Sequence, residues 1–253
     1  MALTRRRCLL ACLPGMLAWC AAPRAGAETR ALRAAVMQIE PYGMLDAQGR
    51  QSGAYTEVFE LLGRELGRPV EVVGAPYARA LALLRSGQVD MMLAMPSPAI
   101  AEVAQPAGAV WSLEAIAIGR AGTPLRRIRD LRGLIVARIR GTDYGPEFMN
   151  DKAIHHYEIS DHVQGLHMLL EKRIDVLVGG RPGIFYAMRK LGVQRSQLGS
   201  AFPVNARDVQ LHMSKKFDDA RLASEVRRGM AALRTDGRID AVIAKYSSGL
   251  PRE

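Results

Sequence analysis

Short apolar runs alternate with segments of helical periodicity through the first half of the chain. The runs at residues 32–37, 69–73 and 89–94 predict strands, and the segments at 55–66 and 78–84 predict helices. An acid and a glycine at 46 and 49 predict a tight turn after the first strand. Buried apolar strands that alternate with helices favour a parallel sheet that is covered on both faces.

The second half of the chain repeats this arrangement. Strands are predicted at 134–139, 154–159 and 175–178, and helices at 145–150, 163–172 and 184–191. Asp90 and Asp175 each begin a buried strand just after a helix ends. We expect these two carboxylates to cap turns rather than to take part in catalysis.

The remaining elements connect the two halves. Residues 113–120 leave the first half, a strand at 208–214 returns to it, and helices follow at 218–234 and 239–246. One strand that leaves a lobe and another that returns would form a two-stranded hinge. The expected fold is therefore α/β, with two Rossmann-like lobes joined by a two-stranded hinge.

The first 27 residues have the layout of a secretory signal peptide, with three arginines, an uncharged stretch and small residues at 25–27. The uncharged stretch is shorter than the roughly 20 residues of a membrane span. Residues 4–10 also resemble a twin-arginine export signal. Twin-arginine export, ordinary secretion and a lipid anchor on Cys12 or Cys20 all stay open, and we expect the mature protein in the periplasm.

The composition narrows the function classes further. All 3 cysteines lie in the leader, so the mature chain has none and its core depends on apolar burial alone. The net charge of +10 comes from scattered arginines, with one cluster at 126–132. Aromatic residues make up only 6% of the chain, which leaves few stacking platforms for single strands. Nucleic acid is therefore disfavoured as a partner.

Several short segments carry a resemblance to the bacterial family 3 extracellular solute-binding proteins. In chain order they include residues 40–43, 53–59, 85–90, 130–133, 140–142 and 233–240. The resemblance implies a monomeric periplasmic binding protein of type II, whose lobes close on a solute by hinge rotation and deliver it to an ABC transporter. It also implies a first lobe at 28–117 and 209–253, and a second lobe at 118–208.

Candidate ligand-binding residues are those at the carboxyl ends of the expected strands, where open α/β sheets bind ligands. Gly141 and Thr142 follow a strand, their backbone amides would attract an anion, and Arg140 adds a positive charge. The resemblance implies that this segment binds an acidic group and that an aromatic residue near Tyr77 packs on the ligand. The full candidate set is Gln38, Tyr42, Tyr77, Arg79, Met95, Ser97, Arg140, Gly141, Thr142, Asp143, Gly180 and Arg181.

Two positions depart from the amino-acid receptors of that family. Residues 95–110 contain no basic residue, although the resemblance implies an arginine there that pairs with the ligand carboxylate. Gly180 occupies the position where an aspartate would receive the ligand ammonium group. An ordinary amino acid is therefore disfavoured. The arginines at 79, 140 and 181 lead us to expect an anionic or neutral polar solute, with an aromatic part as one option.

The sequence offers little support for catalysis or metal binding. It contains no serine elbow, no zinc-binding histidine motif and no phosphate-binding glycine loop, and His162 and His167 are poorly spaced as joint ligands. We therefore expect no enzyme activity, metal or cofactor. The alternatives are an accessory protein that binds a secreted partner enzyme, with the basic cluster at 126–132 as its surface, and a dehydratase-like enzyme. A kinase-fused sensor is disfavoured because no second domain follows residue 246.

Overall fold

The computed structural model describes residues 30–247, so the expected signal peptide and its cysteines lie outside the described residues. Strands of both halves form one 8-stranded sheet in the order β4-β1-β5-β10-β6-β9-β7-β8, and β2 and β3 form a small hairpin. The strands are β1 (Leu32–Met37), β2 (Met44–Leu45), β3 (Gln51–Ser52), β4 (Val70–Ala75), β5 (Met91–Ala94), β6 (Ala104–Gly119), β7 (Ile135–Ile139), β8 (His155–Ile159), β9 (Val176–Gly180) and β10 (Phe202–Ser214).

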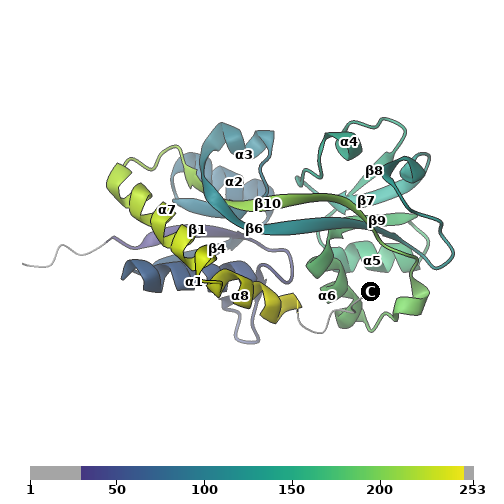
Figure 1. Cartoon of the computed structure of the whole chain (residues 1–253), viewed down its shortest axis with the longest axis horizontal. Helices are drawn as coiled ribbons and strands as arrows, with labels where there is room; N and C mark the ends of the chain where they lie inside the picture. The colour runs from purple at the N-terminus through teal and green to yellow at the C-terminus, as the bar shows by residue number, and fades with distance from the viewer. Residues whose placement is uncertain (1–29, 248–253) are drawn as a thin grey trace, which may run out of the picture.

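Helices cover both faces of this sheet (Figure 1). They are α1 (Ala54–Leu66), α2 (Tyr77–Ser86), α3 (Pro98–Val103), α4 (Pro146–Met149), α5 (His162–Leu170), α6 (Arg181–Leu191), α7 (Ala220–Thr235) and α8 (Arg238–Ser247), with short 3-10 helices at Ile128–Leu131 and Arg195–Gln197. Within residues 30–247, no helix combines the length and the apolar composition needed to cross a membrane.

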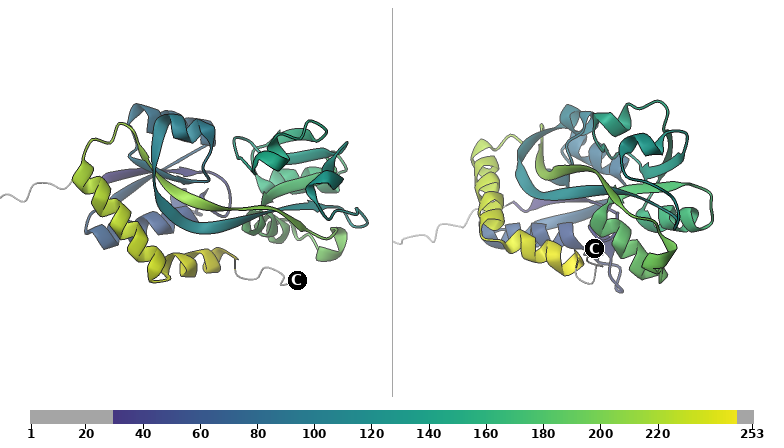
Figure 2. Two further views of the ribbon diagram at one scale, coloured as in Figure 1. Left: turned by 45° about the horizontal axis from the view of Figure 1, so that its top comes forward. Right: turned by 45° about the vertical axis from the view of Figure 1, so that its right-hand side comes forward.

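The sheet is shared between two lobes that lie along the long axis of the molecule (Figure 1). The first lobe contains the parallel strands β4, β1 and β5, and the second contains the parallel strands β9, β7 and β8. β6 and β10 are antiparallel to each other and pass from one lobe into the other, as Figure 2 shows in two further views. The expected α/β fold with two lobes and a two-stranded hinge is confirmed.

Each lobe buries apolar side chains on both faces of its part of the sheet. The first lobe has two separate cores, one of which contains Phe59 of α1 and the other Leu84 of α2. The second lobe also has two, one of which contains Leu166 of α5 and the other Phe148 of α4. Each lobe therefore has its own cores, and the cleft between the lobes is not needed to complete them.

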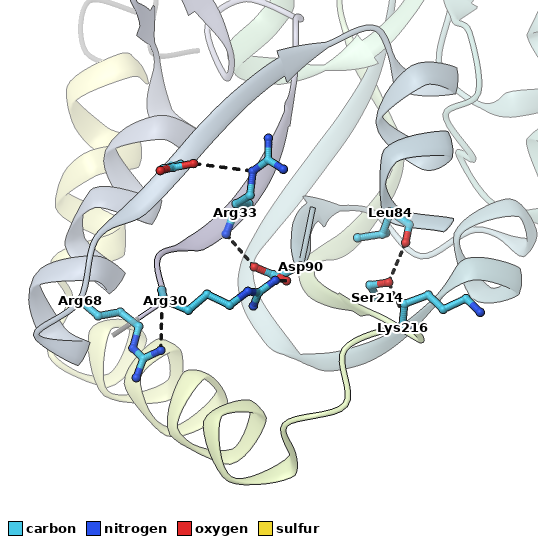
Figure 3. A network of polar contacts seen from close by, with 8 residues as sticks. Arg30, Arg33, Arg68, Leu84, Asp90, Ser214 and Lys216 are labelled. Carbon is cyan, nitrogen blue, oxygen red and sulfur yellow. Dashed lines mark hydrogen bonds and ion pairs between the residues drawn. The ribbon is translucent and has the colours of Figure 1, made fainter. Parts of the chain in front are cut away.

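The two aspartates that directly precede β5 and β9 make the same backbone contacts in both lobes. Asp90 accepts a hydrogen bond from the backbone amide of Arg33 in β1 (2.8 Å, Figure 3), and Asp175 accepts one from the amide of Ile135 in β7 (2.9 Å). Each aspartate amide also donates to the carbonyl of the same residue. These carboxylates therefore tie two neighbouring parallel strands together, instead of capping their own turns as we expected.

The hinge strands are longer than the sequence pattern predicts. β6 begins at Ala104 rather than at 113, and β10 begins at Phe202 rather than at 208. β6 enters the second lobe where Ala115 pairs with Gly180 of β9. The expected lobe boundaries after 117 and 208 fall within these two strands and remain a prediction.

Candidate functional site

A cleft lies between the lobes, at the carboxyl ends of their parallel strands. The first lobe and β6 contribute Met37, Ile39, Tyr42, Tyr55, Tyr77, Ala94, Met95 and Leu113, and the second lobe contributes Ile139, Gly141, Thr142, Asp143, Tyr144, His162 and Gly180. The cavity volume is about 50 Å³, and a site for one water needs roughly 10–15 Å³. The cavity therefore has room for a few waters only, and a larger solute fits only if the lobes move apart.

Tyr42 brings a buried hydroxyl group to the cleft. Its ring lies 5.1 Å from that of Tyr55 and 6.4 Å from that of Trp111, so the first lobe supplies an aromatic wall. The side chain is only 6% exposed, and its hydroxyl makes no hydrogen bond of good geometry among the described residues, although the backbone amide of Gly183 lies near it. Burial raises the pKa of this hydroxyl far above its usual range, so it is neutral. A buried polar group without a partner is rare and indicates a missing ligand or water.

His162 is the second buried polar side chain of the cleft. It is 4% exposed, and neither ring nitrogen makes a hydrogen bond of good geometry among the described residues, although the backbone carbonyl of Glu40 lies near the ring. Gly179 and Gly183 make room for the ring, since a Cβ atom at either position would lie within 2.5 Å of it. Desolvation lowers the pKa of His162 to about 4. The imidazole is therefore neutral at neutral pH, with one nitrogen that donates and one that accepts.

Tyr77 of the first lobe lies in the cleft against the second lobe. Its hydroxyl and that of Ser97 are hydrogen-bonded at 2.9 Å, and Ser97 also accepts from the amide of Ile100 at the start of α3. The Tyr77 ring packs on Gly141 of the second lobe, where a Cβ atom would lie 2.4 Å from the ring. Gly141 has a φ of +76°, a conformation that also favours glycine. The amide of Thr142 donates to Ile139, so it is already used in the turn.

Charged side chains beside the cleft occur in pairs. Asp143 lies 3.3 Å from Arg207 of β10, and Glu40 of the β1–α1 connection lies 2.7 Å from Lys190 of α6. The second pair joins the two lobes directly. Tyr186 of α6 adds a weaker contact to the sulfur of Met44, which belongs to the first lobe. These contacts hold the lobes in the closed arrangement.

The sequence model of the bacterial extracellular solute-binding proteins, family 3, matches residues 32–249. The chain belongs to this family. The resemblance noted in the sequence is thereby confirmed. No curated protein sequence matches the chain.

Solved structures of this family 3 fold are similar to the chain over most of its length. A histidine kinase sensor domain with similarity to periplasmic binding proteins shares 22% identity at a TM-score of 0.73, covering 89% of this chain and 99% of that one. A mutant of ArgBP from T. maritima shares 16% identity at a TM-score of 0.70, covering 86% and 95%. The substrate-binding protein of an amino acid ABC transporter shares 14% identity at 0.69, covering 85% and 98%. These likenesses support the fold.

The structure of this family 3 protein brings most of the predicted site residues to one place. The candidates that line the cleft are Tyr42, Tyr77, Met95, Gly141, Thr142, Asp143 and Gly180. Ser97 touches the cleft through Tyr77. Gln38 lines a shallow neighbouring depression instead.

The three candidate arginines are not among the residues that line the cleft. Arg79 and Arg140 are exposed, and Arg140 is paired with Glu158 at 3.3 Å. Arg181 is paired with Glu114 of β6. The arrangement of these side chains gives no group of positive charges within the cleft, so it does not add to the expectation of an anionic solute.

Other lining residues were not among the candidates. They are Met37, Ile39, Tyr55, Ala94, Leu113, Ile139, Tyr144 and His162. Ile139 and His162 could have been found by the rule already used, since they stand at or just after the ends of β7 and β8. Tyr55 has helical spacing typical of a core position, which conceals that it also lines the cleft. Within residues 30–247, no group of three or more histidine, cysteine or acidic side chains is placed to hold a metal ion.

Proposed function

We propose that the protein captures a small polar solute in the cleft between its lobes, as the periplasmic component of an ABC transporter. Membership of a solute-binding family supports the general role. The observation that carries the proposal for this cleft is the pair of buried side chains, Tyr42 and His162, that line it without a hydrogen bond of good geometry among the described residues. A polar solute between the lobes would satisfy both groups.

The arrangement of the lobes supports capture by hinge closure. Within residues 30–247, only β6 and β10 carry the chain between the lobes, and a few residues of such strands suffice to absorb a rotation. Glu40 and Lys190 would separate as the cleft opens and meet again as it closes. A solute that touches both walls would therefore favour the closed arrangement.

Thermal unfolding and X-ray scattering of the chain without residues 1–27 test this function. The solutes are amino acids, organic acids, amides, sugars and phosphorylated compounds. We expect at least one class to raise the melting temperature with concentration, because it binds only the folded state. The variants Tyr42→Phe and His162→Asn should each reduce the shift. A protein that ignores every class is not a solute receptor, and the accessory-protein alternative would then replace this proposal.

A further inference from the structure

Charges that border the cleft are already neutralised by other charges. Asp143 is the charged residue of the lining, and Arg207 lies 3.3 Å from it while the amide of Gly145 donates to the same carboxylate at 2.7 Å. Glu40 is paired with Lys190 at the neighbouring edge. An ionic solute that enters would lose its hydration and find no uncompensated counter-charge. Burial of an unpaired ion is strongly unfavourable.

Hydrogen bonds in the cleft are offered by neutral groups. The Tyr42 hydroxyl can donate and accept, and a neutral imidazole at His162 can do the same through its two nitrogens. Both side chains are more than nine-tenths buried. A bound group that both donates and accepts, such as an amide, would therefore match the two groups better than a carboxylate, which only accepts.

Most of the remaining lining is apolar and includes aromatic rings from both lobes. Tyr55 and Tyr77 of the first lobe and Tyr144 of the second present rings, and Met37, Met95 and Leu113 present flexible apolar side chains. Aromatic faces favour stacked flat groups, and methionine adapts its shape around them. The body of the solute that fits is therefore flat and apolar.

We infer that the cleft selects an uncharged solute with a flat apolar body and an amide-like edge, recognised by Tyr42 and His162. This inference rests on the proposed function. It also accounts for both departures from the amino-acid receptors, since a neutral solute needs neither the missing arginine nor an aspartate at position 180. A Cβ atom at Gly180 would lie 2.9 Å from the Tyr42 hydroxyl, so the two groups compete for the same space.

Isothermal titration with matched compounds separates charge from shape. Benzamide, benzoate and benzamidine have the same ring and head-group size, and at neutral pH they are neutral, anionic and cationic. The same comparison is made with cyclohexanecarboxamide and its carboxylate, which are not flat. We expect benzamide to bind about tenfold or more tightly than its charged counterparts and than the non-flat amide. Benzoate or benzamidine binding more tightly than benzamide overturns the inference, and leaves the proposed function standing.

Variants connect this selectivity to the named residues. Tyr42→Phe removes only a hydroxyl group and should weaken benzamide binding about tenfold, whereas Tyr157→Phe, on a side chain that is 45% exposed, serves as the control and should not. Arg207→Met would leave Asp143 without its cation, so benzamidine should gain about tenfold relative to benzamide. An unchanged charge preference in Arg207→Met contradicts the argument from paired charges. If none of these compounds nor any solute of the wider screen binds, the proposed function fails together with the inference.

Discussion

Gly180→Ala places a methyl group between the closed lobes. Gly180 ends β9 with φ −60° and ψ 129°, a conformation that alanine adopts freely, so the fold of the second lobe should not change. The new Cβ atom would lie 2.9 Å from the Tyr42 hydroxyl, across the cleft, and 3.2 Å from Leu113 of the hinge strand β6. Because real Cβ contacts are longer, the two walls must separate slightly to relieve the overlap.

The expected magnitude follows from the usual cost of an extra methyl group in a packed site. Overpacking of this kind costs about 1–3 kcal/mol. Here the cost falls on the closed arrangement alone, so the ratio of open to closed molecules should rise by roughly fivefold to 150-fold. We would measure it by X-ray scattering, and by fluorescence transfer between one dye on each lobe.

A matched glycine in the first lobe serves as the control. In Gly229→Ala, the added Cβ atom meets the ends of Leu62 and Leu66 at 3.2 Å and the side chain of Glu65 at 3.5 Å, all inside one lobe. This variant should leave the distance between the dyes unchanged. If Gly180→Ala also leaves that distance unchanged, the closed contact between Tyr42 and Gly180 is not the tight one described, and the steric reasoning is refuted.

Three further predictions concern charges. Lys190→Met removes the cation paired with the half-buried Glu40. The ratio of open to closed molecules, measured by X-ray scattering, should rise about two- to fivefold, and this rise should shrink in high salt. Burial lowers the pKa of His162 to about 4, so its contribution to stability is present above pH 6.5 and is lost as pH falls toward 4. In urea titrations across this pH range, His162→Leu should remove a change in the free energy of unfolding on the order of 3 kcal/mol. Asp90→Asn should lower the free energy of unfolding by about 2 kcal/mol, and Asp175→Asn should lower it by less. The reason is burial, since the Asp90 side chain is 4% exposed and that of Asp175 is 35% exposed. Equal losses in urea titrations would contradict this ranking.

The order of the elements could be predicted because hydrophobic periodicity determines it directly. The expected strand at 32–37 coincides with β1, and the helix at 184–191 lies within α6. The early part of β6 could not be predicted, since Pro106 and Gly108 are residues that normally end a strand. Register shifts in β10 opposite this region accommodate them, and such irregularities depend on the partner strand rather than on local sequence.

The candidate site was only partly predictable for a related reason. The rule that ligands bind at strand ends selects positions, and three of the positions that it selected, Tyr42, Tyr77 and Gly141, lie together in one cleft. It does not give the direction of a long side chain. Arg140 follows β7 as expected, yet its guanidinium is paired with Glu158 of β8. His162 belongs to no motif. Its place after β8 could have marked it as a candidate, but the burial of its ring beside the cleft depends on the space left by two glycines that are distant in the sequence.

The course of β10 has a consequence for how the chain assembles as it is made. β10 lies between β5 and β6, so the first lobe lacks a central strand of its sheet until residues 202–214 have emerged. The second lobe, by contrast, draws its parallel strands from one uninterrupted stretch between β6 and β10. Since chains assemble progressively from the N-terminus, we expect the later-encoded lobe to finish first. A chain cut short before β10 would present the unpaired edges of β5 and β6, which are sites for aggregation.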